Sequence, residues 1–171
     1  MRLQIRIFAL GVAFLIAGCG PARAPSDASI ITRFTAHRAE FIQLLEMFRH
    51  DGIDGRLGCE TQPQPPDDAT RGMQPISAQR RTEYAKIFES IGCDGAVYYY
   101  PGNGRAMFSL WSVGMLFSGQ GKSIMFIPGE APTPLVAATD NYVWTKHDHD
   151  QGAVTLYRHI DGPWYLEYDA N

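Results

Sequence analysis

The chain lacks the short motifs by which catalytic and redox sites are usually recognised in a sequence. Its 171 residues contain no G-x-S-x-G nucleophile motif, no H-E-x-x-H zinc motif and no C-x-x-C redox motif. The stretch GQGKS at residues 119–123 is not a phosphate-binding loop, because Leu116 stands where such a loop needs a glycine, five positions before Gly121. We expect a β-turn there instead. The sequence therefore predicts a protein that is not an enzyme and needs no cofactor.

A hydrophobic run long enough to cross a membrane is also lacking. The longest run begins at Ile7 and ends at Ala17, and Gly11 interrupts it. A bilayer core of about 30 Å takes about 20 helical residues, so this run is too short for a transmembrane helix. Arg2 and Arg6 precede the run and small residues close it. This pattern is typical of a secretory signal peptide.

Two cleavage sites compete after the run. Residues 22–24, Ala-Arg-Ala, have the small-x-small form of ordinary signal-peptidase sites, but Pro25 follows them. Proline lacks an N–H and fits poorly into the extended site of a protease. Residues 16–19, Ile-Ala-Gly-Cys, instead resemble the lipobox of bacterial lipoproteins, an aliphatic residue and two small residues before a cysteine. An ordinary secreted protein and an uncleaved anchor are the alternatives.

The resemblance implies a diacylglycerol on the sulfur of Cys19, cleavage after Gly18 and acylation of the new amine. Each buried CH₂ contributes about 0.8 kcal/mol, so two or three chains on one residue anchor a protein without further help. Gly20, rather than an aspartate, follows the cysteine. In similar lipoproteins this implies transfer to the outer membrane. We therefore expect a protein anchored in the membrane through its lipid and facing the periplasm.

An excess of positive charge is absent as well. Removal of residues 1–18 takes away two arginines, which lowers the formal net charge from −3 to −5. An acidic surface argues against nucleic acid and against anionic lipid headgroups as partners, so another protein, of basic character, fits better. Residues 19–31 comprise the lipidated cysteine and a stretch rich in proline, alanine and serine, which predicts a flexible tether. Residues 32–171 then have the length of a single domain.

Cysteine is scarce, and its use follows from the compartment. With Cys19 assigned to lipid, two of the three cysteines remain, Cys59 and Cys93. A disulfide between them would persist in an oxidising compartment. In the chain-entropy model, a loop of this length gives about 3.8 kcal/mol of stabilisation. We predict a structural Cys59–Cys93 disulfide, with two inert buried thiols or a reactive cysteine as the alternatives.

Hydrophobic periodicity predicts two helices in the first half of the chain. In the first, phenylalanines recur at helical spacing from Phe34 to Phe48, after Thr32 as N-cap. The second follows Ser77 as N-cap and ends at Gly92, a natural glycine terminator. A stripe of phenylalanines needs a large apolar partner, so we expect the first helix to cover a sheet.

After the second helix the sequence favours strands. The expected strands are residues 96–100, 105–113, 122–127, 154–160 and 164–168. We also expect a helical turn within residues 135–144. The loop of the last hairpin should exceed two residues, because Pro163 cannot donate a ladder hydrogen bond. Two helices packed on one antiparallel sheet of about five strands make an α+β fold.

Aromatic residues suggest an interaction surface. Tyr98, Tyr99 and Tyr100 are consecutive, and Trp144 adds a further large ring. Tyrosine and tryptophan are enriched at the centres of protein interfaces. We therefore mark these four residues as candidate interface residues, and the alternative that they serve as core stays open.

The stretch Lys-His-Asp-His-Asp at residues 146–150 is a candidate metal site. In an extended chain His147 and His149 point to the same side, as two metal ligands would. A third ligand is required, for which His159 and Asp161 are candidates if the fold brings them close. The alternative is a solvated polar loop.

The C-terminal segment carries a second resemblance. Residues 157–168, YRHIDGPWYLEY, are similar to the closing segment of small bacterial lipoproteins that reads roughly Y-R-x-I-x-G-x-W-Y-L-Y-Y. The chain departs from that pattern at Pro163 and Glu167. The resemblance covers roughly the last 50 residues and brings no catalytic residues with it.

Three functional hypotheses follow. The first is a lipid-anchored, non-enzymatic protein-binding lipoprotein, of which an immunity protein against an envelope-attacking toxin is one form. The second is a structural or assembly lipoprotein of the envelope. The third is a metal-binding protein or an enzyme that uses the cluster from His147 to Asp150.

Overall fold

The protein has an α+β fold, as the sequence predicts. The computed structural model describes residues 24–59, 76–115, 118–142 and 152–171. The helices are α1 (Asp27–Ala36), α2 (Arg38–Asp51) and α3 (Ala78–Ile91). The strands are β1 (Gly55–Gly58), β2 (Ala96–Tyr100), β3 (Arg105–Met115), β4 (Ser118–Phe126), β5 (Val154–Asp161) and β6 (Trp164–Ala170). They form one antiparallel sheet in the order β1-β2-β3-β4-β6-β5, one strand more than expected.

The first helical segment starts earlier than predicted and is divided in two. Ser26, not Thr32, is the N-cap, and its side chain accepts a hydrogen bond from the backbone N–H of Ser29 at 3.2 Å. Ile30 is buried in the core, so residues 27–31 belong to the folded domain and not to the tether. At His37 the backbone leaves helical geometry, which separates α1 from α2.

Helix α3 is confirmed with its predicted ends. The Ser77 hydroxyl accepts a hydrogen bond from the N–H of Arg80 at 3.1 Å. Gly92 ends the helix in the left-handed conformation, with φ 64°, where a side chain would be strained. The predicted disulfide is also present: Cys93, directly after this glycine, is bonded to Cys59 at the end of β1.

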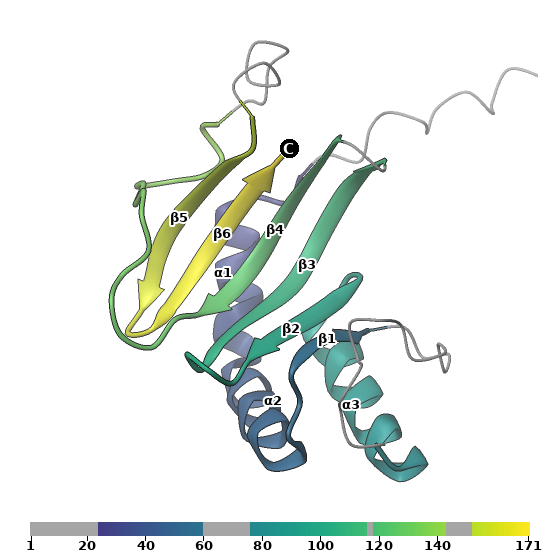
Figure 1. Ribbon diagram of the computed structural model, residues 1–171. Coiled ribbons are helices and arrows are strands. Elements are labelled where there is room, and N and C mark those ends of the chain that lie inside the picture. Colours follow the sequence, from purple (N-terminus) through teal and green to yellow (C-terminus); the bar gives the residue numbers. More distant parts are fainter. Residues whose placement is uncertain (1–23, 60–75, 116–117, 143–151) are drawn as a thin grey trace, which may run out of the picture.

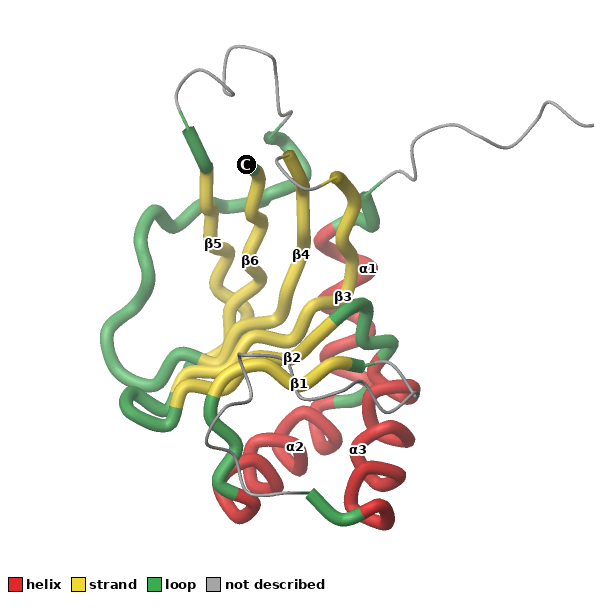
Figure 2. Tube along the Cα trace, turned by 45° about the vertical axis from the view of Figure 1, so that its right-hand side comes forward, coloured by secondary structure: helices red, strands yellow, loops and turns green. Residues whose placement is uncertain are grey.

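All three helices lie on one side of the sheet (Figures 1 and 2). The phenylalanine stripe of α1 and α2 packs on rings from the strands: Phe41 contacts Phe108 of β3 edge to face, with ring centroids 5.0 Å apart. Phe34 contacts Trp164 of β6 at 5.0 Å. Phe48 contacts Tyr99 of β2 at 5.8 Å. This face of the sheet therefore holds the main hydrophobic core.

Two of three sequence expectations about loops are wrong. Residues 119–123 lie within β4 and not in a β-turn, because they pair with β3 on one side and with β6 on the other. The last hairpin has a two-residue turn: Pro163 occupies the turn itself, where no ladder donor is needed, and Gly162 takes a φ of 52°. Of the turn expected within residues 135–144, the described part shows one hydrogen-bonded turn, in which the N–H of Tyr142 donates to the carbonyl of Thr139 at 3.1 Å, and residues 143–151 lie outside the described part.

A buried ion cluster fastens the start of α1 to the sheet. The ammonium of Lys122, 1% exposed, lies 2.8 Å from a carboxylate oxygen of Asp27, which is 0% exposed. Asp140 pairs with the same ammonium and accepts the backbone N–H of Asp27 at 2.8 Å. Thr139 and Arg158 also donate to Asp27, Arg158 at 3.1 Å. Burial opposes ionisation, but these hydrogen bonds outweigh it and hold the pKa of Asp27 well below its usual range.

Replacement of Lys122 should be strongly destabilising. Lys122→Met removes the only ammonium between Asp27 and Asp140 in the described cluster, and breaking a buried pair in this way costs on the order of 3 kcal/mol or more. Urea unfolding measures the change. The control is Lys86→Met, which removes an exposed lysine of α3 and should change stability by less than about 0.5 kcal/mol. Equal unfolding midpoints for the two variants would contradict the prediction.

Candidate functional site on the open face of the sheet

The face of the sheet opposite the helices carries a continuous row of large side chains. Cross-strand partners share one face of a sheet. The register pairs Tyr98 with Met107, Met107 with Met125, Met125 with Tyr165, and Tyr165 with His159. The row therefore crosses β2, β3, β4, β6 and β5. No helix of the described chain lies over it, and we call this side of the sheet the open face (Figure 1).

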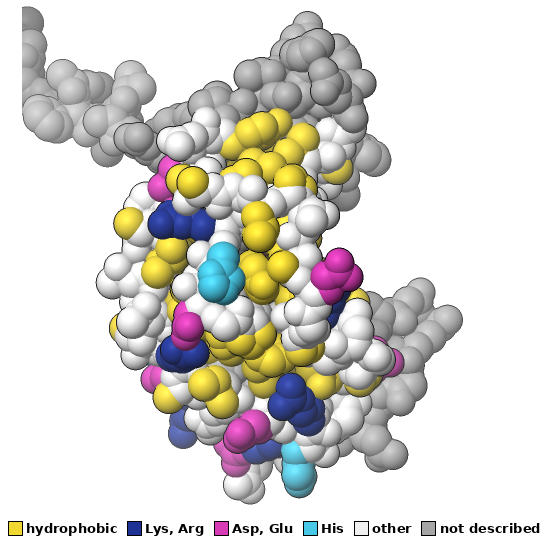
Figure 3. Space-filling view, turned by 90° about the vertical axis from the view of Figure 1, so that its left-hand side faces the viewer, with side chains coloured by type: hydrophobic (Ala, Val, Ile, Leu, Met, Phe, Trp, Pro, Cys, Tyr) yellow, Lys and Arg dark blue, Asp and Glu magenta, His cyan; other side chains and the backbone are white. Residues whose placement is uncertain are grey.

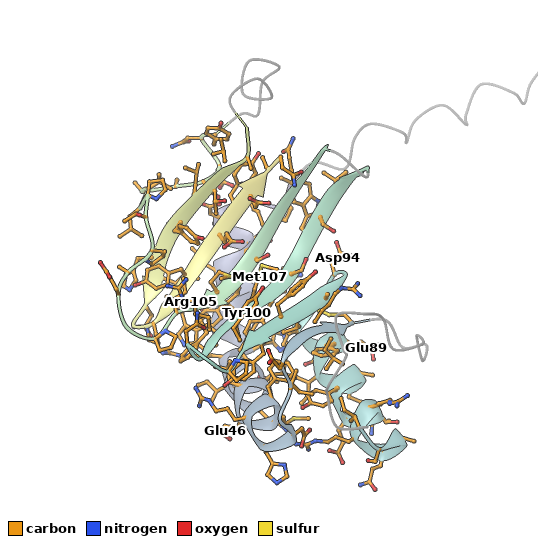
Figure 4. The ribbon with its side chains drawn as sticks, viewed as in Figure 1. Glu46, Glu89, Asp94, Tyr100, Arg105 and Met107 are labelled. Carbon is orange, nitrogen blue, oxygen red and sulfur yellow. A yellow bond between two sulfur atoms is a disulfide. The ribbon has the colours of Figure 1, made fainter. Side chains whose placement is uncertain are left out.

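A second, smaller hydrophobic cluster occupies the open face. Met125, Ile127 and Tyr165 are buried in it, with Met107 and Tyr157 packed against them. Figure 4 shows Tyr100, Arg105 and Met107 on this side of the sheet. Tyr100 is 45% exposed, one of the most exposed large hydrophobic residues that the structure describes. The open face thus combines a partly formed core with exposed aromatic surface.

The open face ends at β5, where the preceding loop lies along the strand. Val136 donates its backbone N–H to the carbonyl of Tyr157 at 2.8 Å, and the backbone N–H of Tyr157 donates to the carbonyl of Pro134 at 3.1 Å. Leu135, between them, is exposed. From this side, hydrophobic side chains form a band down the surface (Figure 3). The loop thus pairs with some of the free backbone N–H and carbonyl groups at the edge of β5, and Leu135 adds apolar surface next to the open face.

Glu167 is an acidic residue buried on the open face. It stands in a second cross-strand row, between Ser123 of β4 and Tyr157 of β5, and is 8% exposed. The Tyr157 hydroxyl donates a hydrogen bond to its carboxylate. Burial, together with the charge of Asp169 two residues along β6, raises the pKa of Glu167 to about 7, and the hydrogen bond from Tyr157 only partly opposes this.

The carboxylate of Glu167 in turn acts on the tyrosines around it. Burial and the charge of Glu167 raise the pKa of Tyr157 to about 12. Burial, Tyr98 and Glu167 also raise the pKa of Tyr100, whose strand is separated from β6 by β3 and β4. Arg105 is the cation that acts on Tyr157. The phenols of β2 and β5 therefore share one electrostatic environment with Glu167.

The three predicted interface tyrosines do not lie on the same face of the sheet. Tyr98 and Tyr100 lie on the open face, because side chains alternate along β2. Tyr99 points to the helices, is 4% exposed and packs against Phe48, so it is a core residue and not part of a surface. Trp144 and the lipidation candidate Cys19 lie outside the described residues.

The predicted metal ligands are not assembled in the described part of the chain. His147 and His149 lie outside it. His159 faces the carbonyl of Gly162 with its Nε2 at 3.0 Å, and Asp161 pairs with Arg38 at 2.6 Å. Among the residues that the structure places, no three side chains of histidine, cysteine, aspartate or glutamate form a group that could hold a metal ion.

A shallow hollow of about 600 Å³ lies between the end of α2 and the start of α3. Its charged groups are paired with one another: Arg80 donates to Asp51 at 2.6 Å and to Glu83 at 2.8 Å, and His50 lies 2.9 Å from Asp51. Burial opposes ionisation of Asp51, but these hydrogen bonds and one from Tyr84 lower its pKa to about 2. The charged groups that line the hollow are thus paired with one another, which makes the hollow a weaker candidate for a binding site than the open face.

Sequence reasoning missed the centre of the open face. Met107, Met125 and Glu167 are spread over 60 positions of the chain and meet only through the strand register. One signal was present: along β6 the large hydrophobic residues Trp164 and Leu166 alternate with Tyr165 and Glu167. This alternation separates two faces, but it does not show which face the helices cover.

Comparisons with known protein families, with curated proteins and with solved structures find no match to this chain. None of the helices in the described ranges has the length and hydrophobicity that a membrane crossing requires. Hypotheses about function therefore depend on the residues of this chain.

Glu167 should make the protein less stable as the pH rises. Its folded-state pKa of about 7 exceeds the ordinary 4.5, so the folded protein binds more protons than the unfolded chain between these values. Stability therefore falls from pH 4.5 to pH 7, by on the order of 3 kcal/mol, and then levels off. Glu167→Gln should abolish this loss and be more stable than the parent at pH 8.

Urea unfolding at pH 4.5, 6, 7 and 8 tests the prediction. The control is Glu89→Gln, which makes the same change of charge at an exposed position of α3 (Figure 4). Glu89→Gln should follow the parent at every pH. Parallel curves for Glu167→Gln and the parent would show that the carboxyl of Glu167 titrates normally.

Proposed function

We propose that the protein is a lipid-anchored, non-enzymatic binding protein of the bacterial cell envelope, and that the open face of its sheet binds another protein. The composition of that face carries the proposal. Tyr98, Tyr100, Met107 and Tyr157 belong to the residue types enriched at interface centres, where aromatic side chains and methionine replace lysine and glutamate. A sheet face without a described helix leaves these side chains available to a partner.

The anchor follows from the lipobox-like residues 16–19. The structured domain begins at Ser26, so a lipidated Cys19 would be joined to it by six residues. Such a chain spans about 25 Å from Cys19 to Ser26 when fully extended. The binding surface would therefore operate close to the membrane, facing the periplasm if the anchor lies in the outer membrane.

Lipidation is tested in cells. The full-length protein should sediment with membranes and incorporate labelled fatty acid, and Cys19→Ser should lose the fatty acid because its acceptor sulfur is gone. The control is the double variant Cys59→Ser, Cys93→Ser, which lacks the disulfide but retains Cys19 and should keep the label. Labelling of Cys19→Ser at the parent level would contradict the anchor.

The binding surface is tested with two variants of matched exposure. Tyr100 on the open face is 45% exposed, and Ile42 on the helix side is 42% exposed. The mature protein, immobilised in non-ionic detergent, is incubated with a detergent extract of the envelope of the same cells. Tyr100→Ala should reduce capture of the partner about ten-fold, since an anchoring aromatic residue contributes more than about 1 kcal/mol to binding.

Ile42→Ala should leave the amount captured unchanged. Only a protein that the parent and Ile42→Ala retain, and that Tyr100→Ala loses, supports the proposal. Equal capture by all three proteins, or loss with Ile42→Ala alone, would contradict the assignment of the open face.

A further inference from the structure

Two carboxylates of the described chain are buried, and they differ in the charged groups that surround them. Asp27, on the helix side, is held by the ammonium of Lys122 and the guanidinium of Arg158. Glu167, on the open face, has a hydroxyl donor in Tyr157 and a second acid, Asp169, as its nearest charged neighbour along the strand. Within the described residues, the fold thus compensates one buried negative charge and places no cation at the other.

The groups that face Glu167 from the surrounding strands are mostly uncharged. Ser109 and Ser123 share its row, and Tyr165 and Asp169 flank it on β6. The remaining polar groups of the open face include Arg56, Tyr98, Tyr100, Arg105, Ser112, Thr155, Tyr157 and His159. Arg105 influences Tyr157, but none of Arg56, Arg105 and His159 is among the groups that shift the pKa of Glu167.

A carboxylate buried without a cation is unfavourable, and proteins normally pair such a group. Here the unpaired carboxylate is placed on the face that no described helix covers, among the tyrosines that form the candidate interface. A cation brought by a partner would remove the imbalance. The partner should therefore carry a positively charged group that reaches the carboxylate of Glu167 among these tyrosines.

We propose that the partner is a protein that inserts an arginine side chain among the tyrosines of the open face and pairs it with Glu167. This inference rests on the proposed function and names the partner's chemistry. A guanidinium fits better than an ammonium, because it is planar, stacks on aromatic rings and bonds a carboxylate through two N–H groups. Tyr100 and Tyr157 supply rings, and Asp169 supplies a second carboxylate.

No side chain of β4 stands beside Asp169. The residue that pairs with Asp169 on β4 is Gly121, which has no side chain to cover the carboxylate. On the other side, Thr155 of β5 donates its hydroxyl to Asp169 at 3.0 Å and leaves the second carboxylate oxygen for another donor. A guanidinium entering over Gly121 would therefore meet Asp169 first and Glu167 next.

Binding of the arginine should release a proton near neutral pH. The guanidinium pairs only with the ionised form of Glu167, whose pKa is about 7. The ionised fraction rises from about one-tenth at pH 6 to about nine-tenths at pH 8, so affinity should rise about ten-fold over this range. The guanidinium itself keeps its charge throughout, which assigns the change to the protein.

Isothermal titration calorimetry tests the inference with a defined probe. The mature protein in non-ionic detergent micelles is titrated with a tetra-arginine peptide at pH 6, 7 and 8. The expected result is a dissociation constant about ten-fold lower at pH 8 than at pH 6, with a heat at pH 7 that varies with the ionisation enthalpy of the buffer. A tetra-citrulline peptide, which has the same shape without the charge, should bind at least ten-fold more weakly at pH 8.

Two variants locate the site. Glu167→Gln keeps the size and a hydrogen-bonding partner for Tyr157, and it should bind tetra-arginine weakly and without dependence on pH. Glu89→Gln, with the same change of net charge on α3, should behave as the parent, which separates a site from general attraction to an acidic protein. Equal loss in both variants, or unchanged affinity in Glu167→Gln, overturns the inference.

The capture experiment distinguishes this failure from failure of the proposed function. If Tyr100→Ala loses the envelope partner while Glu167→Gln retains it at every pH, the open face binds a protein but not through arginine at Glu167. If both variants retain the partner at the parent level, the open face is not the binding surface and both proposals fail.

Discussion

The structure depends on the buried contact between Lys122 and Asp27. This ion pair joins β4, a central strand of the sheet, to the first residue of α1, and Asp140 and Arg158 complete it. It fixes where the helical layer begins and directs Lys122 toward the helices. Because side chains alternate along a strand, Ser123 then points to the open face, where it pairs with Glu167. A shift of one residue in β4 would exchange the two faces and bury Ser123 against α1.

The same register separates two kinds of electrostatics across one sheet. On the helix side, opposite charges are matched within the chain, which stabilises the fold and leaves nothing for a ligand. On the open face, Glu167 is ionised only against the effect of its surroundings. A protein that needed only stability would gain by an apolar residue at this position, as it has at Leu166 next to it. The unmatched carboxylate is therefore better explained by binding than by folding.

Local signals predicted the elements whose ends are marked by their own residues. Helix α3 lies between Ser77 and Gly92, and β2 and β3 flank the turn Pro-Gly-Asn-Gly, so both were identified from the sequence. The start of α1 was not, because proline, alanine and serine around it favour a linker, and the residues that fix Asp27, Lys122 among them, are distant in the sequence. The glycines of β4 likewise favour a turn locally, but hydrogen-bonded pairing with β3 and β6 makes this segment a strand. The candidate site was predicted least well: Tyr98 and Tyr100 were identified by type, but Glu167 became visible only when the register placed it among them.

The earlier start of the domain has a consequence for how an anchored protein would meet its partner. Helix α1 begins at the end of the molecule where β6 finishes, and the sheet extends from that end to the opposite one (Figure 1). With a tether of six residues, a lipid on Cys19 would keep this end within about 25 Å of the bilayer. The part of the open face at that end, which includes Asp169, would then lie close to the membrane surface. A partner that places an arginine near Asp169 would therefore lie in the same membrane or close to it, because the short tether keeps this end of the domain near the bilayer.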